Sequence, residues 1–290
     1  MRRKFPPCLR GFRLQGSVPL DVHIKGVSDV DLLVLDDGFV TYMVMGAKAL
    51  AGGYTSPATR TSVGVLSKLR SQIESDLQAA FPAATVDKSG AKAVKIFGGS
   101  LARHVDVVPA HWLDTIAWQD SGKEVDRGVK ILDKKAGTTI ENLPFLHIER
   151  IRSRCIGTGG GLRKAIRLCK NVKEDSERQI FLPSFDIAAT MYHADMSALR
   201  NGLVFELAIL SETQRHLDFL AVNQAYARTL LVPDGSRAIF DTDEKWQGLL
   251  RLSSEMDDLL SNVFVENAPG LLGYGSSMSQ KRGAVASISA

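Results

Sequence analysis

Two aspartates stand two residues apart in an aliphatic run of the kind that forms a buried β-strand. The run reads Ser28-Asp-Val-Asp-Leu-Leu-Val-Leu, and its aliphatic residues favour strands. Residues i and i+2 of a strand point to the same face, so Asp29 and Asp31 are expected to lie side by side. Two adjacent anions are costly unless a cation lies between them, and their oxygens suit Mg²⁺. The run therefore predicts a metal-binding strand end, although an Asp-x-Asp pair also arises by chance about once in a chain of this length.

Further polar residues flank this pair at a distance along the chain. Gly16 and Ser17 follow a short apolar-alternating stretch upstream, and Asp106 lies between valines downstream. A glycine lets the backbone approach a phosphate closely, and a serine hydroxyl with nearby N–H groups can hold phosphate oxygens. Three carboxylates can hold two metal ions. The series therefore predicts a site that holds metal ions beside phosphate groups.

Composition and cysteine usage favour a globular cytoplasmic protein. The 290 residues are enough for one large domain or two small ones, and no apolar run approaches the roughly 20 residues of a membrane span. Cys8, Cys155 and Cys169 have no paired spacing, which argues against a zinc site or a disulfide framework. The net charge of +4 is too small to indicate nucleic-acid binding. We expect a cytoplasmic location and no membrane association.

The pattern of apolar residues predicts a strand-rich part followed by a helical part. Strands are expected at Arg10–Gln15, 30–35, 93–97 and 103–108, a helix at 56–81 with Pro57 in its first turn, and a hairpin over 128–141. From Pro144 onward the spacing is helical, and the glycine run at 157–161 is interpreted as a hinge between helices. Residues 268–290, rich in Gly, Ser and Ala, are expected to form a flexible tail. The predicted class is α+β, with domains at 1–143 and 144–267 and the tail after them.

Residues 150–173 carry eight basic side chains and no acidic one. Such a run is usually a solvated face. Beside a nucleotide site it can instead face a triphosphate or a polyanionic activator such as nucleic acid. The sequence leaves these alternatives open.

The order of the motifs resembles that of a known enzyme superfamily. The Gly-Ser, Asp-x-Asp and later Asp elements are similar to the active-site signature of polymerase-beta-like nucleotidyltransferases. The helical part contains three segments that resemble the bacterial cGAS/DncV-like nucleotidyltransferases (CD-NTases) of anti-phage signalling: Gly160-Gly-Leu-Arg-Lys-Ala-Ile-Arg-Leu-Cys-Lys, Leu182-Pro-Ser-Phe-Asp-Ile-Ala and Val232-Pro-Asp-Gly-Ser-Arg. The resemblance covers about residues 10–265. It implies a polymerase-beta-like sheet lobe followed by an all-helical lobe, with the nucleotide in the cleft between them.

This resemblance implies a role for each matching residue of the strand-rich part. Gly16 and Ser17 would hold the donor triphosphate. Asp29 and Asp31 would bind two Mg²⁺ ions, with Mn²⁺ as an alternative. Asp106 would be a further metal ligand and would help to activate the acceptor hydroxyl.

Three residues of the helical part also match functional positions of the family. Lys170 and Ser184 would contact the β and γ phosphates, and Phe185 would stack on a base. The residues by themselves permit plainer roles as well. Lys170 also fits a surface lysine, Ser184 a helix cap and Phe185 an aromatic of the core.

The resemblance implies a synthase that joins ATP or another NTP into a cyclic di- or oligonucleotide and releases pyrophosphate. The alternatives are addition of a single nucleotide to RNA, a protein or a small molecule, and an inactive nucleotide-binding pseudo-enzyme. A regulatory protein or conjugation through the C-terminus at Ala290 is also implied. Family members usually carry a long helix before the Gly-Ser strand, for which the residues ahead of Gly16 leave too little room. We expect that helix either upstream of Met1 or lost.

Overall fold

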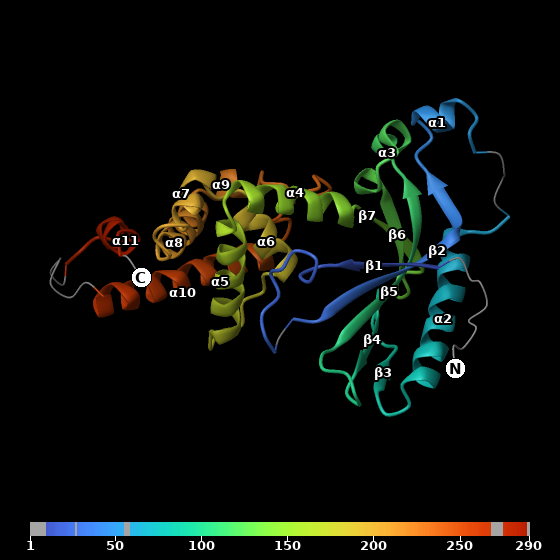
Figure 1. Ribbon diagram of the computed structural model, residues 1–290, viewed down its shortest axis with the longest axis horizontal. Coiled ribbons are helices and arrows are strands. Elements are labelled where there is room, and N and C mark those ends of the chain that lie inside the picture. The colour runs from blue at the N-terminus through green and yellow to red at the C-terminus, as the bar shows by residue number, and fades with distance from the viewer. Residues whose placement is uncertain (1–9, 27, 55–58, 268–274, 289–290) are drawn as a thin grey trace. The chain divides into compact units, whose positions relative to one another are not determined.

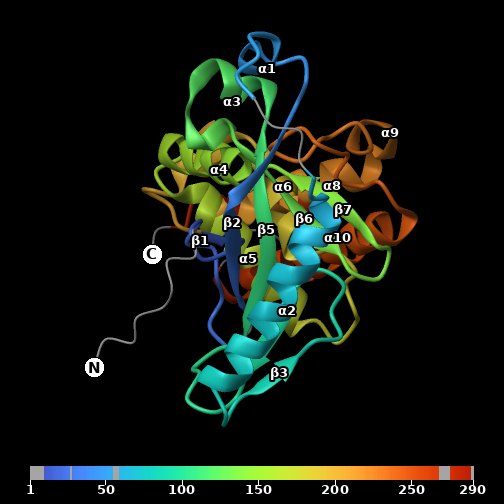
Figure 2. The ribbon, with the colours of Figure 1, turned by 90° about the vertical axis from the view of Figure 1, so that its right-hand side faces the viewer.

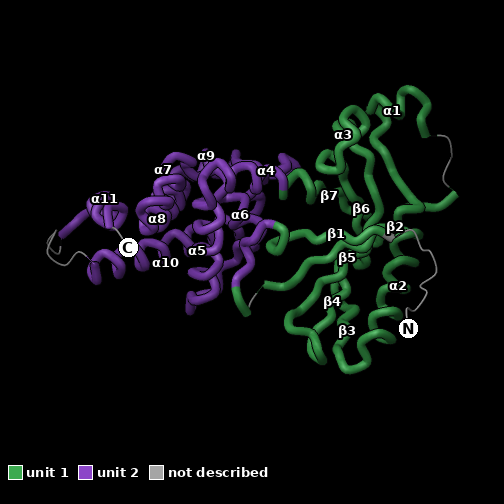
Figure 3. The backbone as a smooth tube through the Cα atoms, in the orientation of Figure 1, with its two compact units in different colours: residues 1–19, 25–148 green, residues 20–24, 149–290 purple. Residues whose placement is uncertain are grey.

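The computed structural model describes residues 10–26, 28–54, 59–267 and 275–288. The chain forms two compact units (Figure 3). Unit 1 comprises Met1–Pro19 and Lys25–Ile148, and unit 2 comprises Leu20–Ile24 and Glu149–Ala290. The seven strands of the described residues all lie in unit 1, and unit 2 is helical, which confirms the α+β class. The chain therefore leaves unit 1 after Pro19, contributes a five-residue segment to unit 2 and returns.

A mixed sheet forms the framework of unit 1 (Figure 1). Five strands lie in the order β1 (Arg10–Gln15), β2 (Val30–Tyr42), β5 (Val105–Asp114), β4 (Val94–Phe97) and β3 (Thr85–Asp87). The later part of β5 pairs with β6 (Gly128–Asp133), which pairs with β7 (Thr138–Asn142). Only β2 and β5 are parallel among these pairs. The predicted strands are present, and β2 and β5 extend well beyond their predicted ends.

Helix α2 (Ser62–Ala80) covers one face of this sheet, as Figure 2 shows. It begins where the side chain of Thr61 accepts a hydrogen bond from the Gly64 N–H, a preferred N-cap arrangement. The predicted start at residue 56 is therefore too early, and Pro57 lies outside the described residues. Apolar side chains of α2 pack on alternate residues of the strands; this cluster contains Val34, Leu66, Leu69, Ile73, Val94, Val107 and Leu132.

The opposite face of the sheet carries a second apolar cluster. It contains Leu33, Leu35, Val108, Ala110, Trp112, Val129 and Ile131. Successive strand residues point to opposite faces, so Val34 faces α2 whereas Leu33 and Leu35 face away from it. By the same alternation Asp31 and Asp106 lie on the face that α2 leaves uncovered. Short helices α1 (Ala47–Leu50), α3 (Ile116–Ser121) and the 3₁₀ turn η1 (Glu124–Asp126) complete unit 1.

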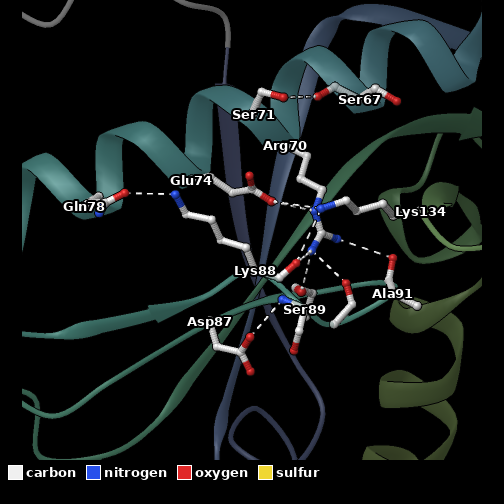
Figure 4. Close-up of polar contacts among 12 residues, drawn as sticks. Ser67, Arg70, Ser71, Glu74, Gln78, Asp87, Lys88, Ser89, Ala91 and Lys134 are labelled. Atoms are coloured by element: carbon white, nitrogen blue, oxygen red, sulfur yellow. Dashed lines mark hydrogen bonds and ion pairs between the residues drawn. The ribbon is translucent and has the colours of Figure 1, made fainter.

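A buried arginine fixes the loop that leads into β4 (Figure 4). The guanidinium of Arg70 on α2 donates to four backbone carbonyls of that loop, at Lys88, Gly90, Ala91 and Ala93, over 2.7–3.3 Å. It also pairs with Glu74 at 2.9 Å. Because the arginine is only 2% exposed, these bonds are shielded from water and hold the loop firmly. The start of β4 is thereby set relative to α2.

Unit 2 is an assembly of helices. They are α5 (Gly161–Asp175), α6 (Ser184–Tyr192), α7 (Met196–Asn201), α8 (Ala208–Val222), α9 (Gln224–Ala227), α10 (Asp243–Asn267) and α11 (Met278–Ala286), while α4 (Pro144–Gly157) begins in unit 1 and ends in unit 2. Gly159 and Gly160 have φ angles of 58° and 89°, a region that favours glycine, so the glycine run separates α4 from α5 as predicted. Among the described residues, no helix combines the length and apolar character needed to cross a bilayer.

The expectation of a flexible tail over 268–290 does not hold for α11. Ser277 and Gln280 form a capping box at its start, which satisfies two helix-end donors. Val285 is fully buried, and Arg282 bonds to Gln214 at 2.8 Å. Packing against α8 and α10 therefore orders this segment despite its small side chains.

Candidate functional site

A row of charged side chains crosses the middle of the sheet in unit 1. Asp31 on β2 lies directly opposite Asp106 on β5, and Asp106 lies directly opposite Lys95 on β4. Residues in register on neighbouring strands share a face with Cβ atoms about 5 Å apart. Asp29 comes immediately before β2 and shares an ion-pair partner with Asp106. The structure thus brings together the three predicted carboxylates, hereafter the carboxylate row: Asp29, Asp31 and Asp106.

Gly16 approaches the row from the neighbouring strand. β1 ends at Gln15, which lies opposite Asp31, so the turn that follows starts beside the row. Gly16 has a φ of 69°, and a Cβ at this position would lie 2.1 Å from Oδ2 of Asp31. Both the backbone angle and the close approach require glycine. Ser17 follows in the same turn and is partly exposed.

Lys95 supplies the positive charge of the row. Its Nζ lies 2.7 Å from Oδ2 of Asp29 and 3.7 Å from Oδ1 of Asp106. The other Asp29 oxygen lies 3.5 Å from Nδ1 of His104. The hydrogen bond to Asp29 raises the pKa of Lys95 above its usual value, so the ammonium stays charged. An adjacent cation is what a pair of neighbouring carboxylates needs.

Asp106 is a half-buried carboxylate of the row, and its surroundings change its pKa. Burial raises the pKa of Asp106, the Lys95 ammonium acts in the opposite direction, and the Asp29 carboxylate adds to the rise. Its Oδ1 is buried and has no hydrogen-bond partner. A carboxylate in this state gains stability from any further cation or proton donor.

The side chains of the row fit a divalent cation by the chemistry of their donors. Carboxylate oxygens are the hard ligands that Mg²⁺ and Mn²⁺ prefer, and Oδ1 of Asp106 lacks a hydrogen bond. Across the described ranges, however, no three His, Cys, Asp or Glu side chains already converge on one ion position. Lys95 instead lies against Asp29. The row therefore has the ligands for a metal, in an arrangement balanced by an ammonium group.

In unit 2, helix α5 holds the segment Leu20–Ile24, here called the strap. Asp21 is the one described non-glycine residue with a positive φ, 53°, a conformation that aspartate tolerates better than most residues. Its carboxylate pairs with Arg163 at 3.2 Å and with Arg167 at 3.7 Å. Arg167 also donates to the Asp21 carbonyl at 3.3 Å. The two arginines thus fasten the strap a few residues after Gly16 in the chain.

Lys170 fastens the same strap from the next turn of α5. Its Nζ donates to the backbone carbonyl of Val22 at 2.9 Å. Lys170 is 5% exposed and Val22 is 2% exposed, so the interpretation as a surface lysine is wrong. A buried ammonium requires such partners, because an unpaired charge in the interior is strongly unfavourable.

The other basic side chains of residues 150–173 also have partners inside the described parts of the chain. The contacts are Arg150 with Pro233, Arg152 with Glu149, Arg154 with Ala194, Lys164 with Glu206 and Lys173 with Leu182. Burial lowers the pKa of Lys173. The run is therefore largely a network that ties α4 and α5 to their surroundings, and not simply a solvated face.

Ser184 and Phe185 form the first turn of α6, which packs against α5. The N-cap of α6 is Pro183, and the helix has no side-chain cap, so the interpretation of Ser184 as a cap is wrong. Both residues are exposed, Phe185 to 37%. The interpretation of Phe185 as an aromatic of the core is therefore wrong. An exposed hydroxyl and an exposed ring at a helix start are suited to an anionic ligand with an aromatic base.

A buried ion cluster lies directly behind Phe185. Asp186 is fully buried, and Nη2 of Arg237 donates to it at 2.6 Å while Nζ of Lys245 lies 3.3 Å away. Lys245 also pairs with Asp241 at 2.7 Å. The guanidinium carbon of Arg237 lies 5.4 Å from the ring centre of Phe185, within the range of a cation–π contact. The cluster therefore holds a cation over the exposed ring.

Sequence reasoning missed Lys95, Asp21 and Arg237 as members of these clusters. For Lys95 a signal existed, because Val94 and Ile96 flank it in a strand and place it on the opposite face. The strand pairing that brings it to Asp106 is a tertiary feature. Asp21 and Arg237 meet partners 142 and 51 residues away, for which the sequence has no local signal.

Comparison with known proteins identifies relatives over most of the chain. No protein-family model matches. The chain is 46% identical over 258 residues to a cyclic dinucleotide synthase, CdnE, of Yersinia aleksiciae. The aligned region covers 88% of this chain and 67% of that protein. It is 31% identical over 275 residues to a c-di-GMP synthase of Capnocytophaga granulosa, covering 87% and 76% of the two chains.

Solved structures agree with these sequence matches. The STING-associated CdnE c-di-GMP synthase from Capnocytophaga granulosa superposes with a TM-score of 0.70 at 30% identity, covering 87% of this chain and 74% of that one. The Rhodothermus marinus CdnE c-UMP-AMP synthase shares the fold, with a TM-score of 0.66 at 19% identity over 95% and 89% of the chains. The chain belongs to the CdnE cyclic dinucleotide synthases, a group of the cGAS/DncV-like nucleotidyltransferases.

Proposed function

We propose that this protein joins two NTPs into a cyclic dinucleotide by two successive nucleotidyl transfers. The observation that carries the proposal is the register of the sheet, which aligns Asp31 with Asp106 and places Gly16 against Asp31. Membership of the CdnE synthases supports cyclisation over the addition of a single nucleotide. GTP is the first substrate to test, because the Capnocytophaga granulosa relative is named a c-di-GMP synthase. ATP and the other NTPs follow.

Each transfer forms one bond and breaks one bond. The 3′- or 2′-hydroxyl oxygen of the acceptor nucleotide bonds to the α-phosphorus of the donor, and the bond from that phosphorus to pyrophosphate breaks. Asp106 would help to take up the hydroxyl proton as the new bond forms. The second transfer repeats the step and closes the ring.

The remaining residues bind and orient the substrates. Gly16 and Ser17 hold the donor phosphates in a turn where no side chain obstructs the backbone. Lys170 and Ser184 act on the outer phosphates, and Phe185 stacks on a base, a contact worth roughly 1–3 kcal/mol. Bound at Asp29, Asp31 and Asp106, Mg²⁺ or Mn²⁺ would neutralise charge on the phosphates and lower the pKa of the hydroxyl. Positioning and electrostatics would thus supply the catalysis.

The biological setting of the family extends the proposal. A cyclic dinucleotide made in the cytoplasm would act as a signal in anti-phage defence. A regulatory protein, or conjugation at the C-terminus, would control its synthesis. Ala290 itself lies outside the described residues.

Product analysis with labelled NTPs tests the proposal. Purified protein is incubated with each NTP alone and in pairs, with Mg²⁺ or Mn²⁺, and the phosphatase-resistant product is identified by mass spectrometry. We expect a cyclic dinucleotide that is lost when Asp29→Ala and Asp31→Ala are combined. The matched control combines Asp76→Ala and Asp120→Ala, which remove two carboxylates of the same unit away from the row, and keeps the activity.

Two results would change the proposed function. A linear product, or AMP attached to RNA or protein, would make the enzyme a single-nucleotide transferase. Nucleotide binding without pyrophosphate release under any condition would make it a pseudo-enzyme.

A further inference from the structure

Lys95 lies among the carboxylates, at a position where a metal ion would also bind. Strand pairing aligns it with Asp106, and Val94 beside it packs toward α2, so the lysine must point to the side of the row. The Arg70 bonds to the preceding loop fix the start of its strand. The pairing of the strands therefore places the lysine beside the row.

The contacts of Lys95 differ between the two carboxylates that it touches. Its Nζ makes a hydrogen-bonded ion pair with Asp29 at 2.7 Å, whereas Asp106 is 3.7 Å away and keeps an oxygen without a hydrogen bond. One ammonium thus balances Asp29 well and Asp106 incompletely. Like charges close together repel each other, so the lysine between Asp29 and Asp106 stabilises both carboxylates.

A divalent ion would compete with the Lys95 ammonium for Oδ2 of Asp29. A metal–oxygen distance of about 2.1 Å is required for Mg²⁺, and the ammonium hydrogens already occupy Oδ2 of Asp29. Two cations around one carboxylate oxygen repel each other strongly. The side chain of Lys95 is 36% exposed, so its flexible stem has room to move the ammonium away.

We propose that Lys95 is a built-in counter-ion that stabilises the carboxylate row and that competes with a metal ion for Oδ2 of Asp29. Lys95 then lowers the metal affinity of the site, so that a higher metal concentration is needed to occupy it. It is a positioning residue, because it acts on the metal ligands and not on the reacting atoms. The inference rests on the proposed function insofar as it takes the row to be the metal site.

Metal binding to a lysine variant tests the proposal without measuring turnover. Lys95→Met keeps the length of the side chain and removes the charge. We expect its Kd for Mn²⁺, measured by electron paramagnetic resonance on the protein without nucleotide, to fall by at least about fivefold. In the absence of metal its Tm falls by roughly 2–4 °C, and Mg²⁺ raises that Tm more than it raises the Tm of the wild type.

Two further variants make the result specific. Lys130→Met removes a lysine of β6 that pairs with Glu141 at 3.2 Å, outside the carboxylate row, and leaves the Mn²⁺ affinity unchanged. Lys95→Arg keeps the charge and retains the weak affinity of the wild type. An unchanged or weaker affinity in Lys95→Met would overturn the proposal and make the lysine a support of the site. If the wild type bound no metal at all, the metal site of the proposed function would fail and this inference with it.

Discussion

Lys95 in unit 1 and Lys170 in unit 2 each place an ammonium group within 3 Å of an oxygen, in very different surroundings. Lys95 is partly exposed, and its close partner is the carboxylate of Asp29. Lys170 is buried and donates to the carbonyl of Val22. A lysine on an open row of carboxylates can be exchanged for another cation, because its partners keep their charge when it leaves. A lysine buried on a backbone carbonyl is part of the packing, because its departure leaves both groups unsatisfied.

The same contrast extends to the residues around each lysine. In unit 1 one lysine lies between the carboxylates of Asp29 and Asp106, and Asp106 retains a buried oxygen without a hydrogen bond. In unit 2 Arg163, Arg167 and Lys170 of α5 contact the Asp21 carboxylate and backbone carbonyls of the strap. A partly exposed cluster of carboxylates indicates a place for a ligand, whereas buried bonds to the backbone indicate a structural fastening. Three substitutions test this distinction, beginning with the largest expected effect.

Gly16→Ala is expected to lower kcat/KM by about 100-fold or more, because a misplacement near 1 Å at a reacting centre has this effect. The new Cβ would lie 2.1 Å from Oδ2 of Asp31, which must move out of the row. Gly137→Ala is the matched control. It has nearly the same φ, 67°, but no atom within 4 Å of the new Cβ, so it carries the backbone strain alone. Equal losses of activity in the two variants would show that strain, and not the displaced carboxylate, is responsible.

Lys170→Met is expected to lower the free energy of unfolding by about 1.5–3 kcal/mol, the range for a hydrogen bond to a charged group. The carbonyl of Val22 would lose its donor in a buried environment. Lys164→Met on the same helix removes an exposed ion pair with Glu206 and should leave the stability nearly unchanged, because water screens such a pair. Urea unfolding followed by circular dichroism measures both values.

Kinetics of the Lys170 variant separates its two roles. If Lys170 also contacts the β and γ phosphates, KM for the NTP rises in addition to the loss of stability. A large rise in KM with unchanged stability would contradict the assignment of Lys170 as a fastening of the strap. Such a result would show that Lys170, like Lys95, acts on a bound ligand.

Arg237→Met is expected to have the smallest effect on KM for the NTP, a rise of roughly 2–5-fold, because an exposed cation–π contact contributes about 0.5–1 kcal/mol. The variant also takes a hydrogen-bond donor from the buried Asp186 carboxylate, so it should be less stable as well, and urea unfolding measures that loss separately. The guanidinium would no longer hold the ring of Phe185 for base stacking. In a Phe185→Leu background the same change should have no further effect on KM. Arg228→Met, at an arginine of similar exposure that pairs with Asp243, is the control. Additive effects of the Arg237 and Phe185 changes would show that Arg237 does not act through the ring.

The sequence was informative wherever a pattern is local. Alternating residues predicted β1 and the start of β2, and the same alternation placed Asp29 and Asp31 on one face. Helical spacing predicted the helical part from Pro144 onward, and the glycine run predicted the break before α5. The segment that became α11 was missed, because its small residues resemble a linker and its order comes from contacts with α8 and α10.

The sequence by itself determined the division into a strand-rich part and a helical part, and it identified the three carboxylates and the glycine beside them. Strand and helix periods and residue chemistry are properties of short segments. Only the tertiary structure decided which charges meet. The register of β4 and β5 aligns Lys95 with Asp106, and the path of the strap through unit 2 brings Asp21 and Val22 to α5. These partners are 11 to 148 residues apart in the chain. Their pairing follows from strand register and helix packing, which depend on the burial of apolar side chains throughout each unit.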